Sequence, residues 1–117
     1  MNGWAKKPMD RMEMYSILAK IYVQTASGFG KMGLAMFIRQ NAGPTVRPKY
    51  NVIAKTIIRC GLLIKQGKCG RGISYRWNLK KFGPVSIPMA DELIAETENQ
   101  IRINAKAKRR NKKNEQA

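Results

Sequence analysis

The sequence predicts a mainly α-helical protein with one small β-hairpin, which places it in the α+β class. Apolar residues recur every three to four positions through the first sixty residues, a spacing typical of helices that bury one face. After Gly61 the spacing changes to alternation, which is typical of a half-buried strand. The length of 117 residues suits one domain and is too short for two ordinary ones.

We expect a single folded domain with basic ends. The expected parts are a basic arm over residues 1–8, the domain over 9–79, a linker over 80–87, a helix over 88–105 and a disordered basic tail over 106–117. The tail is expected to be disordered because residues 106–113 are almost entirely Lys, Arg, Asn and Ala.

The first helix is expected to begin near Pro8, because proline suits the first helical turn. Asp10 and Glu13 then complement the helix dipole. The apolar face that should enter the core consists of Met14, Ile17, Leu18, Ile21, Tyr22 and Thr25. The opposite, polar face consists of Glu13, Ser16, Lys20 and Gln24.

Two further helices are expected before the hairpin. Residues 27–30 end the first helix, and a second follows over 31–41 with Leu34, Phe37 and Ile38 as its buried face. Residues 42–45 contain glycine and proline and end the second helix. A third helix is expected over residues 48–60, with Gly61 as its C-terminal cap.

The hairpin is expected to consist of a short apolar strand over residues 62–66, a glycine-rich basic turn over 67–72 and a second strand over 73–78. The second strand alternates strictly. Ile73, Tyr75 and Trp77 should face the helices, and Ser74 and Arg76 should face outward.

The expected C-terminal helix carries a narrow apolar seam. Pro88 suits its first turn, and Asp91 and Glu92 follow near its N-terminus. The seam consists of Ala90, Leu93, Ile94, Thr97 and Ile101. It either pairs with a second copy, which makes a homodimer an expectation for this chain, or packs on the domain.

The charge distribution favours an anionic partner. The chain has 23 Lys and Arg against 7 Asp and Glu, a formal net charge of +16, and residues 14–90 contain no acidic residue. Such a one-signed surface is typical of nucleic-acid-binding proteins, although an anionic membrane surface or an acidic protein would also match it.

No segment has the roughly 18 to 20 apolar residues needed to span a bilayer. The N-terminus lacks a signal-peptide pattern, so we expect an intracellular, cytoplasmic and nucleoid-associated protein without membrane partners.

Enzymatic chemistry has few candidate residues in this sequence. The chain has no histidine, and its expected domain contains almost no acids, so we expect a non-enzyme with no cofactor and no metal site. Cys60 and Cys69 alone cannot supply a structural zinc site, and a disulfide is not expected in a reducing cytosol. Residues 28–33 match the pattern G-x-G-x-x-G, but they follow a helix rather than a strand and predict no dinucleotide site.

From about residue 9 to 78 the chain resembles the winged helix-turn-helix family. The resemblance depends on the short turn at 42–45, the helix end and first strand in the run IIRCGLLI at 57–64, and the closing strand ISYRWN at 73–78. It implies a DNA-binding domain whose third helix enters the major groove. A small regulator, or a replication or mobile-element accessory factor, would fit this resemblance.

The candidate DNA-binding residues follow from helix geometry and the basic turn. They are Arg47, Lys49, Asn51, Lys55 and Arg59 on or beside the third helix, Lys65, Lys68, Arg71 and Arg76 on the hairpin, and Lys108, Arg109 and Arg110 in the tail. Arg pairs well with guanine and Asn with adenine, whereas the hairpin and tail suit phosphates. Ile58 interrupts the polar stripe of the third helix. Solvated surface charge is the alternative interpretation of this stripe.

Two alternative functions also match the sequence. Winged helices and basic tails also bind RNA, so an RNA-binding protein or ribonucleoprotein component is one alternative to a protein that prefers duplex DNA. The second is an adaptor whose domain docks on another protein.

Overall fold

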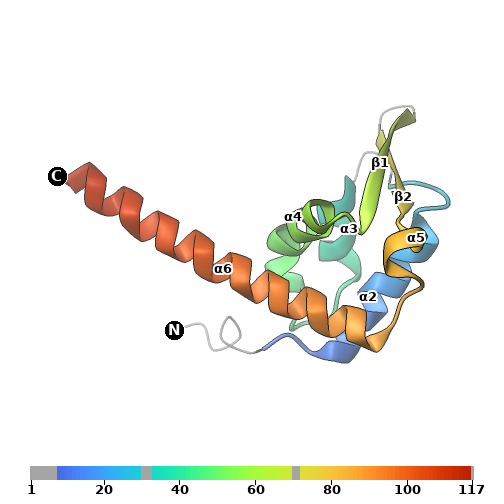
Figure 1. The fold of residues 1–117 in the computed structure, drawn as a ribbon, viewed down its shortest axis with the longest axis horizontal. Helices are drawn as coiled ribbons and strands as arrows, with labels where there is room; N and C mark the ends of the chain where they lie inside the picture. The colour runs from blue at the N-terminus through green and yellow to red at the C-terminus, as the bar shows by residue number, and fades with distance from the viewer. Residues whose placement is uncertain (1–7, 30–32, 70–71, 117) are drawn as a thin grey trace.

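In the computed structural model the backbone is described for residues 8–29, 33–69 and 72–116, and the side chains for the same residues except 68, 69, 72, 73 and 109–116. The elements are α2 (Arg11–Gln24), α3 (Gly33–Asn41), the 3-10 turn η2 (Arg47–Lys49), α4 (Tyr50–Cys60), β1 (Leu63–Cys69), β2 (Gly72–Trp77), α5 (Leu79–Phe82) and α6 (Ile87–Gln116). The predicted class, mainly helical with one small antiparallel hairpin, is confirmed (Figure 1).

Helix α2 begins later than the sequence suggested. Its N-cap is Asp10, whose carboxylate accepts a hydrogen bond from the Glu13 backbone N–H at 3.1 Å. The start predicted near Pro8 was therefore wrong, because the capping side chain rather than the proline determines where the helix begins. The predicted core face is confirmed for Met14, Ile17, Leu18 and Ile21, which are buried.

Glu13, on the predicted polar face of α2, is half-buried and binds the turn between α3 and α4. Its carboxylate accepts hydrogen bonds from the backbone N–H and the hydroxyl of Thr45, each at 2.9 Å. The Thr45 hydroxyl in turn accepts a bond from the Asp10 N–H at 2.9 Å. These bonds tie the start of α2 to the turn between α3 and α4.

Helices α3 and α4 pack against one another and complete the core. α3 buries Leu34 and Ile38, while Phe37 is half-buried. α4 starts at Tyr50, after the 3-10 turn that occupies the predicted first residues of this helix. Gly61 ends α4 at φ 83°, a left-handed conformation that favours glycine, so the predicted cap is confirmed.

The hairpin is longer than predicted and contains a bulge. Lys65 lies opposite Tyr75 but Gly67 lies opposite Ser74, so Gln66 is an extra residue in β1. Gly67, at φ 136°, adopts a backbone conformation that is rare for residues with a side chain. The predicted turn over 67–72 was therefore wrong at its start, because Gly67 lies in a bulge and pairing continues to Cys69.

Trp77 joins the hairpin to the rest of the domain. Its ring is 4% exposed and makes an edge-to-face contact with Tyr22 of α2 at a centroid distance of 5.1 Å. Its indole N–H donates to the Gly83 carbonyl at 2.9 Å. The predicted linker over 80–87 begins with the short helix α5, because Asn78 caps that turn by accepting a bond from the Lys81 N–H.

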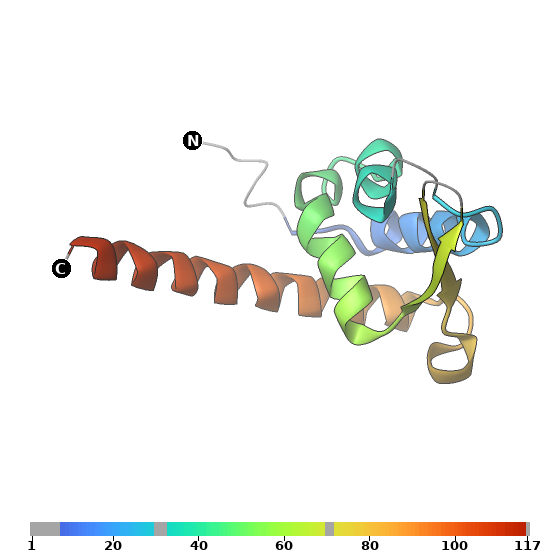
Figure 2. The same ribbon diagram turned by 90° about the horizontal axis from the view of Figure 1, so that it is seen from above.

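Helix α6 packs on α2 and α4 with its first half and projects from the domain with its second half (Figures 1 and 2). Ala90, Leu93 and Thr97 of the predicted seam are buried against the domain. Beside this contact, Arg11 forms a two-pronged ion pair with Asp91, at 2.7 and 3.0 Å, whose hydrogen bonds raise the pKa of Arg11 above its ordinary value.

The disordered tail predicted over 106–117 differs from the structure, in which α6 continues to Gln116. Ala, Lys and Arg are strong helix formers, and no Gly or Pro follows Pro88 to end the helix. Among the described residues, none of the helices is long and apolar enough to cross a membrane.

Candidate nucleic-acid interface

Helix α4 presents a polar face that is separate from its buried face. Asn51, Lys55 and Arg59 are exposed and recur every fourth residue, so they share one side of the helix. The opposite side is packed into the core by Ile53, Thr56 and Ile57. The structure thus brings together three of the five candidate residues predicted on or beside the third helix.

An open groove of about 460 Å³ lies along this polar face. Its lining comes from three elements: Leu34 and Ala35 of α3, Asn51, Ala54, Lys55, Ile58 and Arg59 of α4, and Tyr75 of β2. Ile58 is 42% exposed within it. The isoleucine that interrupted the predicted stripe therefore gives this groove an exposed apolar patch among polar side chains.

Tyr75 is placed in the groove by aromatic packing. The Phe29 ring contacts Phe37 of α3 at 5.2 Å and Tyr75 at 5.9 Å between centroids, in both cases edge to face. This chain of rings joins the segment after α2, helix α3 and strand β2. Sequence alternation predicted that Tyr75 faces the helices, but nothing in the alternation indicated that it would line a groove.

Arg47 has a different environment from the rest of the predicted stripe. Its guanidinium donates to the Ala42 carbonyl at 2.8 and 3.2 Å, which satisfies a backbone acceptor just after α3. Lys49 is half-buried at the junction of η2 and α4. Nearby, the Arg39 guanidinium lies 5.7 Å from the Tyr50 ring centroid and joins α3 to the start of α4.

The cations of the hairpin are divided between the two sheet faces. Opposite residues of an antiparallel pair share a face, so Lys65 lies on the same face as Tyr75. Arg76 lies opposite Ile64 and on the other face. The side chain of Lys68 and the whole of Arg71 lie outside the described residues.

The remaining predicted cations belong to the outer half of α6. Lys108 is exposed, while the side chains of Arg109 and Arg110 lie outside the described residues. Figure 1 shows this half of α6 leading away from α4 and the hairpin. The outer half of α6, with the exposed Lys108, therefore lies apart from the groove.

Comparison of the chain with protein-family models, with curated proteins and with solved structures found no match.

Proposed function

We propose that this chain is a nucleic-acid-binding protein with a winged-helix fold and that duplex DNA is its partner. The order of elements supports this fold: helices α2, α3 and α4 are followed by an antiparallel hairpin whose closing strand packs on α2 and on Phe29 of the segment after it. In this assignment α4 is the helix that enters the major groove and the β1–β2 hairpin is the wing.

The observation that carries the proposal is the groove beside α4. Asn51, Lys55 and Arg59 lie along it in a chain whose residues 14–90 include no acid. A nucleic acid placed there would meet cations and an amide, and the residues that line the groove include no carboxylate to repel its phosphates.

The chemistry of these side chains suits direct recognition of bases. A major groove about 12 Å wide admits a helix, and from α4 the guanidinium of Arg59 would pair with a guanine edge. The Asn51 amide would pair with an adenine edge, and exposed Ile58 would contact thymine methyl groups. Lys65, on the sheet face that carries Tyr75, would bind a phosphate.

The test compares binding to a preferred duplex, selected from random sequences, with binding to unrelated duplexes. Asn51→Ala or Arg59→Ala should weaken binding to the preferred duplex by about 1–3 kcal/mol and affect unrelated duplexes much less. Lys20→Ala is the charge control, because Lys20 lies on α2 and donates to the Asn41 carbonyl at 3.2 Å. It should reduce both affinities slightly and equally.

Two results would redirect the proposal. Tighter binding to structured RNA than to any selected duplex would favour an RNA-binding protein. Duplex binding that is unchanged by the combined replacement of Asn51, Lys55 and Arg59 with alanine would show that α4 is not the binding element.

A further inference from the structure

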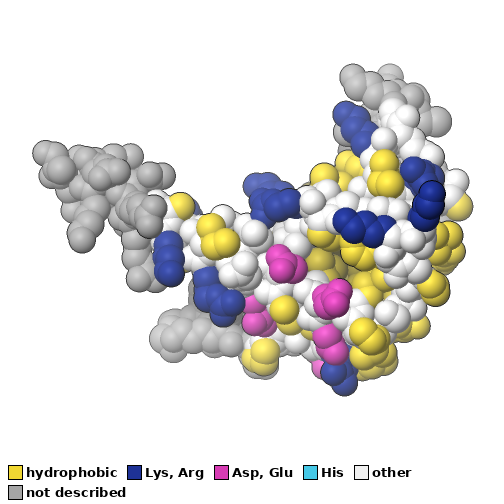
Figure 3. Space-filling view, viewed as in Figure 1, with side chains coloured by type: hydrophobic (Ala, Val, Ile, Leu, Met, Phe, Trp, Pro, Cys, Tyr) yellow, Lys and Arg dark blue, Asp and Glu magenta, His cyan; other side chains and the backbone are white. Residues whose placement is uncertain are grey.

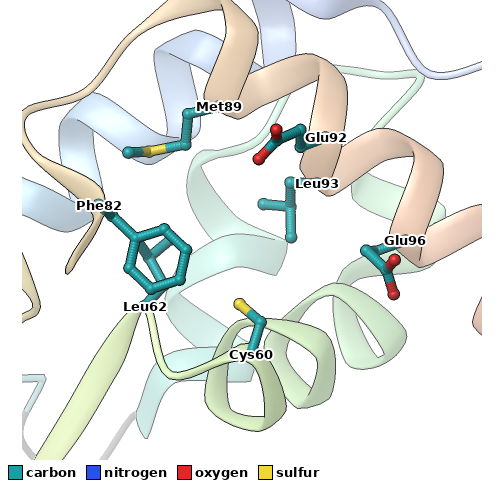
Figure 4. Close-up of a pocket in the computed structure, with 7 residues that line it drawn as sticks. All are labelled: Cys60, Leu62, Phe82, Met89, Glu92, Leu93 and Glu96. Carbon is teal, nitrogen blue, oxygen red and sulfur yellow. The ribbon is translucent and has the colours of Figure 1, made fainter.

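A small apolar pocket with an acidic rim lies beside α6, away from the groove of α4. It has a volume of about 70 Å³ and is lined by Cys60, Leu62, Phe82, Met89, Glu92, Leu93 and Glu96. Figure 4 shows Glu92 and Glu96 one turn apart on α6, with Phe82 and Leu62 across the pocket. Neither carboxylate has an ion-pair partner among the described side chains, although Asp91 beside them is paired with Arg11.

The outer half of the same helix carries the complementary groups. Ile103 is 48% exposed and Lys106 is exposed. Residues 92, 96, 99, 103 and 106 are separated by alternating steps of four and three, so they form one stripe along α6. The stripe is acidic at the domain end and basic at the outer end. Figure 3 shows acidic side chains over the inner part of α6 and basic ones further along it.

We propose that α6 pairs antiparallel with α6 of a second copy through this stripe. The symmetry axis would pass near residue 101, so that Glu96 lies opposite Lys106 of the other copy and Asn99 lies opposite its Ile103. A parallel pair would instead bring Glu96 against Glu96, which is unfavourable. Because α6 is one continuous helix, its outer half cannot fold back onto its own acidic stripe.

The apolar wall of the pocket explains why the partner is a lysine-bearing helix rather than a free cation. A lysine side chain covers apolar surface with its methylene groups while its ammonium stays in the solvated rim. Lys106 of the other copy would lay its stem over Leu93 and place its charge beside Glu96.

The proposed interface does not compete with the core of the domain. Ala90 and Thr97, which are fully buried, lie on the side of the helix away from the stripe, and Met89 and Leu93 lie between these residues and the stripe, at the pocket. Of the two roles open for the narrow seam, pairing with a second copy or packing on the domain, its first turns take the second, and the charged stripe is the proposed dimer contact. This pairing does not rest on the proposed function.

Sedimentation equilibrium of the full chain near 0.15 M salt tests the pairing. The unchanged chain should form a dimer, and Glu96→Lys or Lys106→Glu should each weaken it on the order of tenfold or more, since each change makes two symmetry-related pairs repulsive. The combined variant Glu96→Lys/Lys106→Glu should restore the dimer, because both pairs are then attractive with reversed signs. Glu98→Lys is the matched control, since Glu98 lies off the stripe, and it should leave the dimer intact.

Orientation is tested by thiol crosslinking in a chain whose Cys60 and Cys69 are replaced by alanine. A mixture of the Asn99→Cys and Ile103→Cys chains should crosslink more than either chain alone. A monomer at several hundred micromolar, failure of the combined variant to restore the dimer, or an equal loss in Glu98→Lys would overturn the proposal. Circular dichroism separates these outcomes from a loss of helix in any variant.

Discussion

The carboxylate of Glu13 accepts two hydrogen bonds from Thr45, which lies 32 positions further along the sequence. One bond comes from the backbone N–H of Thr45 and the other from its hydroxyl. The turn that precedes α4 is thereby fixed to the first turn of α2. Since α4 carries the candidate interface, this polar contact acts together with the apolar core to position it. The contact also explains the glycine at position 43, where a Cβ would overlap the Glu13 side chain.

Replacing Gly43 with alanine should therefore destabilise the protein by about 1–3 kcal/mol, because the added methyl group displaces the Glu13 carboxylate. Urea denaturation measures the change. In a Glu13→Ala chain, replacing Gly43 with alanine should change the free energy of unfolding little, since the overlapping side chain is gone. An equal loss of stability in the unchanged chain and in the Glu13→Ala chain would show that Gly43 is required for another reason.

Replacing Trp77 with alanine should cost about 3–5 kcal/mol in the free energy of unfolding, because its buried ring joins β2 to α2. Trp77→Phe keeps a ring against Tyr22 but loses the hydrogen bond to the Gly83 carbonyl. Trp77→Phe should therefore lower the free energy of unfolding by less than Trp77→Ala does. A loss below about 1 kcal/mol in Trp77→Ala would mean that the ring is not part of the core.

The features that the sequence predicted are those set by local chemistry. The C-cap at Gly61 and the change from helical spacing to alternation each depend on a few neighbouring residues. Four of the six positions predicted for the core face of the first helix are buried, since periodicity reports which face of a helix meets a core, whereas Tyr22 at the edge of that face is 38% exposed. For the candidate site, the same periodicity placed Asn51, Lys55 and Arg59 on one face.

Features that depend on distant partners were missed. Glu13 was predicted on the polar face of α2, but nothing near it in the sequence indicated its partner Thr45, which lies in the turn after α3. The bulge at Gln66 depends on pairing with β2 and has no signature in β1 alone except Gly67. Arg47 appeared to continue the α4 stripe, but its guanidinium is bound to the Ala42 carbonyl. Composition also misled at the C-terminus, since a basic segment rich in Ala, Lys and Arg suits a helix as well as a tail.

The buried hydroxyl of Thr97 predicts an unusual gain in stability. Thr97 is 0% exposed and its Oγ1 has no hydrogen-bond partner among the described residues. Thr97→Val keeps the shape and removes the unsatisfied polar group, so thermal unfolding should show a chain more stable by about 1 kcal/mol. Thr97→Ala is the companion variant and should lower stability, because it leaves a cavity where the methyl group was. A destabilised valine variant would mean that the hydroxyl makes a favourable bond.

The outer cations of α6 should contribute to DNA affinity without contributing to sequence preference. Replacing Lys108, Arg109 and Arg110 with glutamine should weaken preferred and unrelated duplexes about equally. The slope of log affinity against log salt should fall by roughly 0.9 for each phosphate that the variant no longer neutralises. Fluorescence anisotropy at several salt concentrations measures both quantities. A loss of affinity for the preferred duplex alone would instead assign base recognition to α6.

Helix α6 has 30 residues and a length of about 45 Å. It is one continuous helix, but its inner and outer turns differ in local stability. Ala90, Leu93 and Thr97 pack its first turns against the domain, so we expect the amide protons of these turns to exchange with solvent slowly, through unfolding of the domain. The outer turns of a single chain have no such support and open by fraying from the C-terminus. Hydrogen exchange along α6 should therefore fall into two classes with a boundary near residue 101, and the slow class should extend outward when a second helix covers the outer turns.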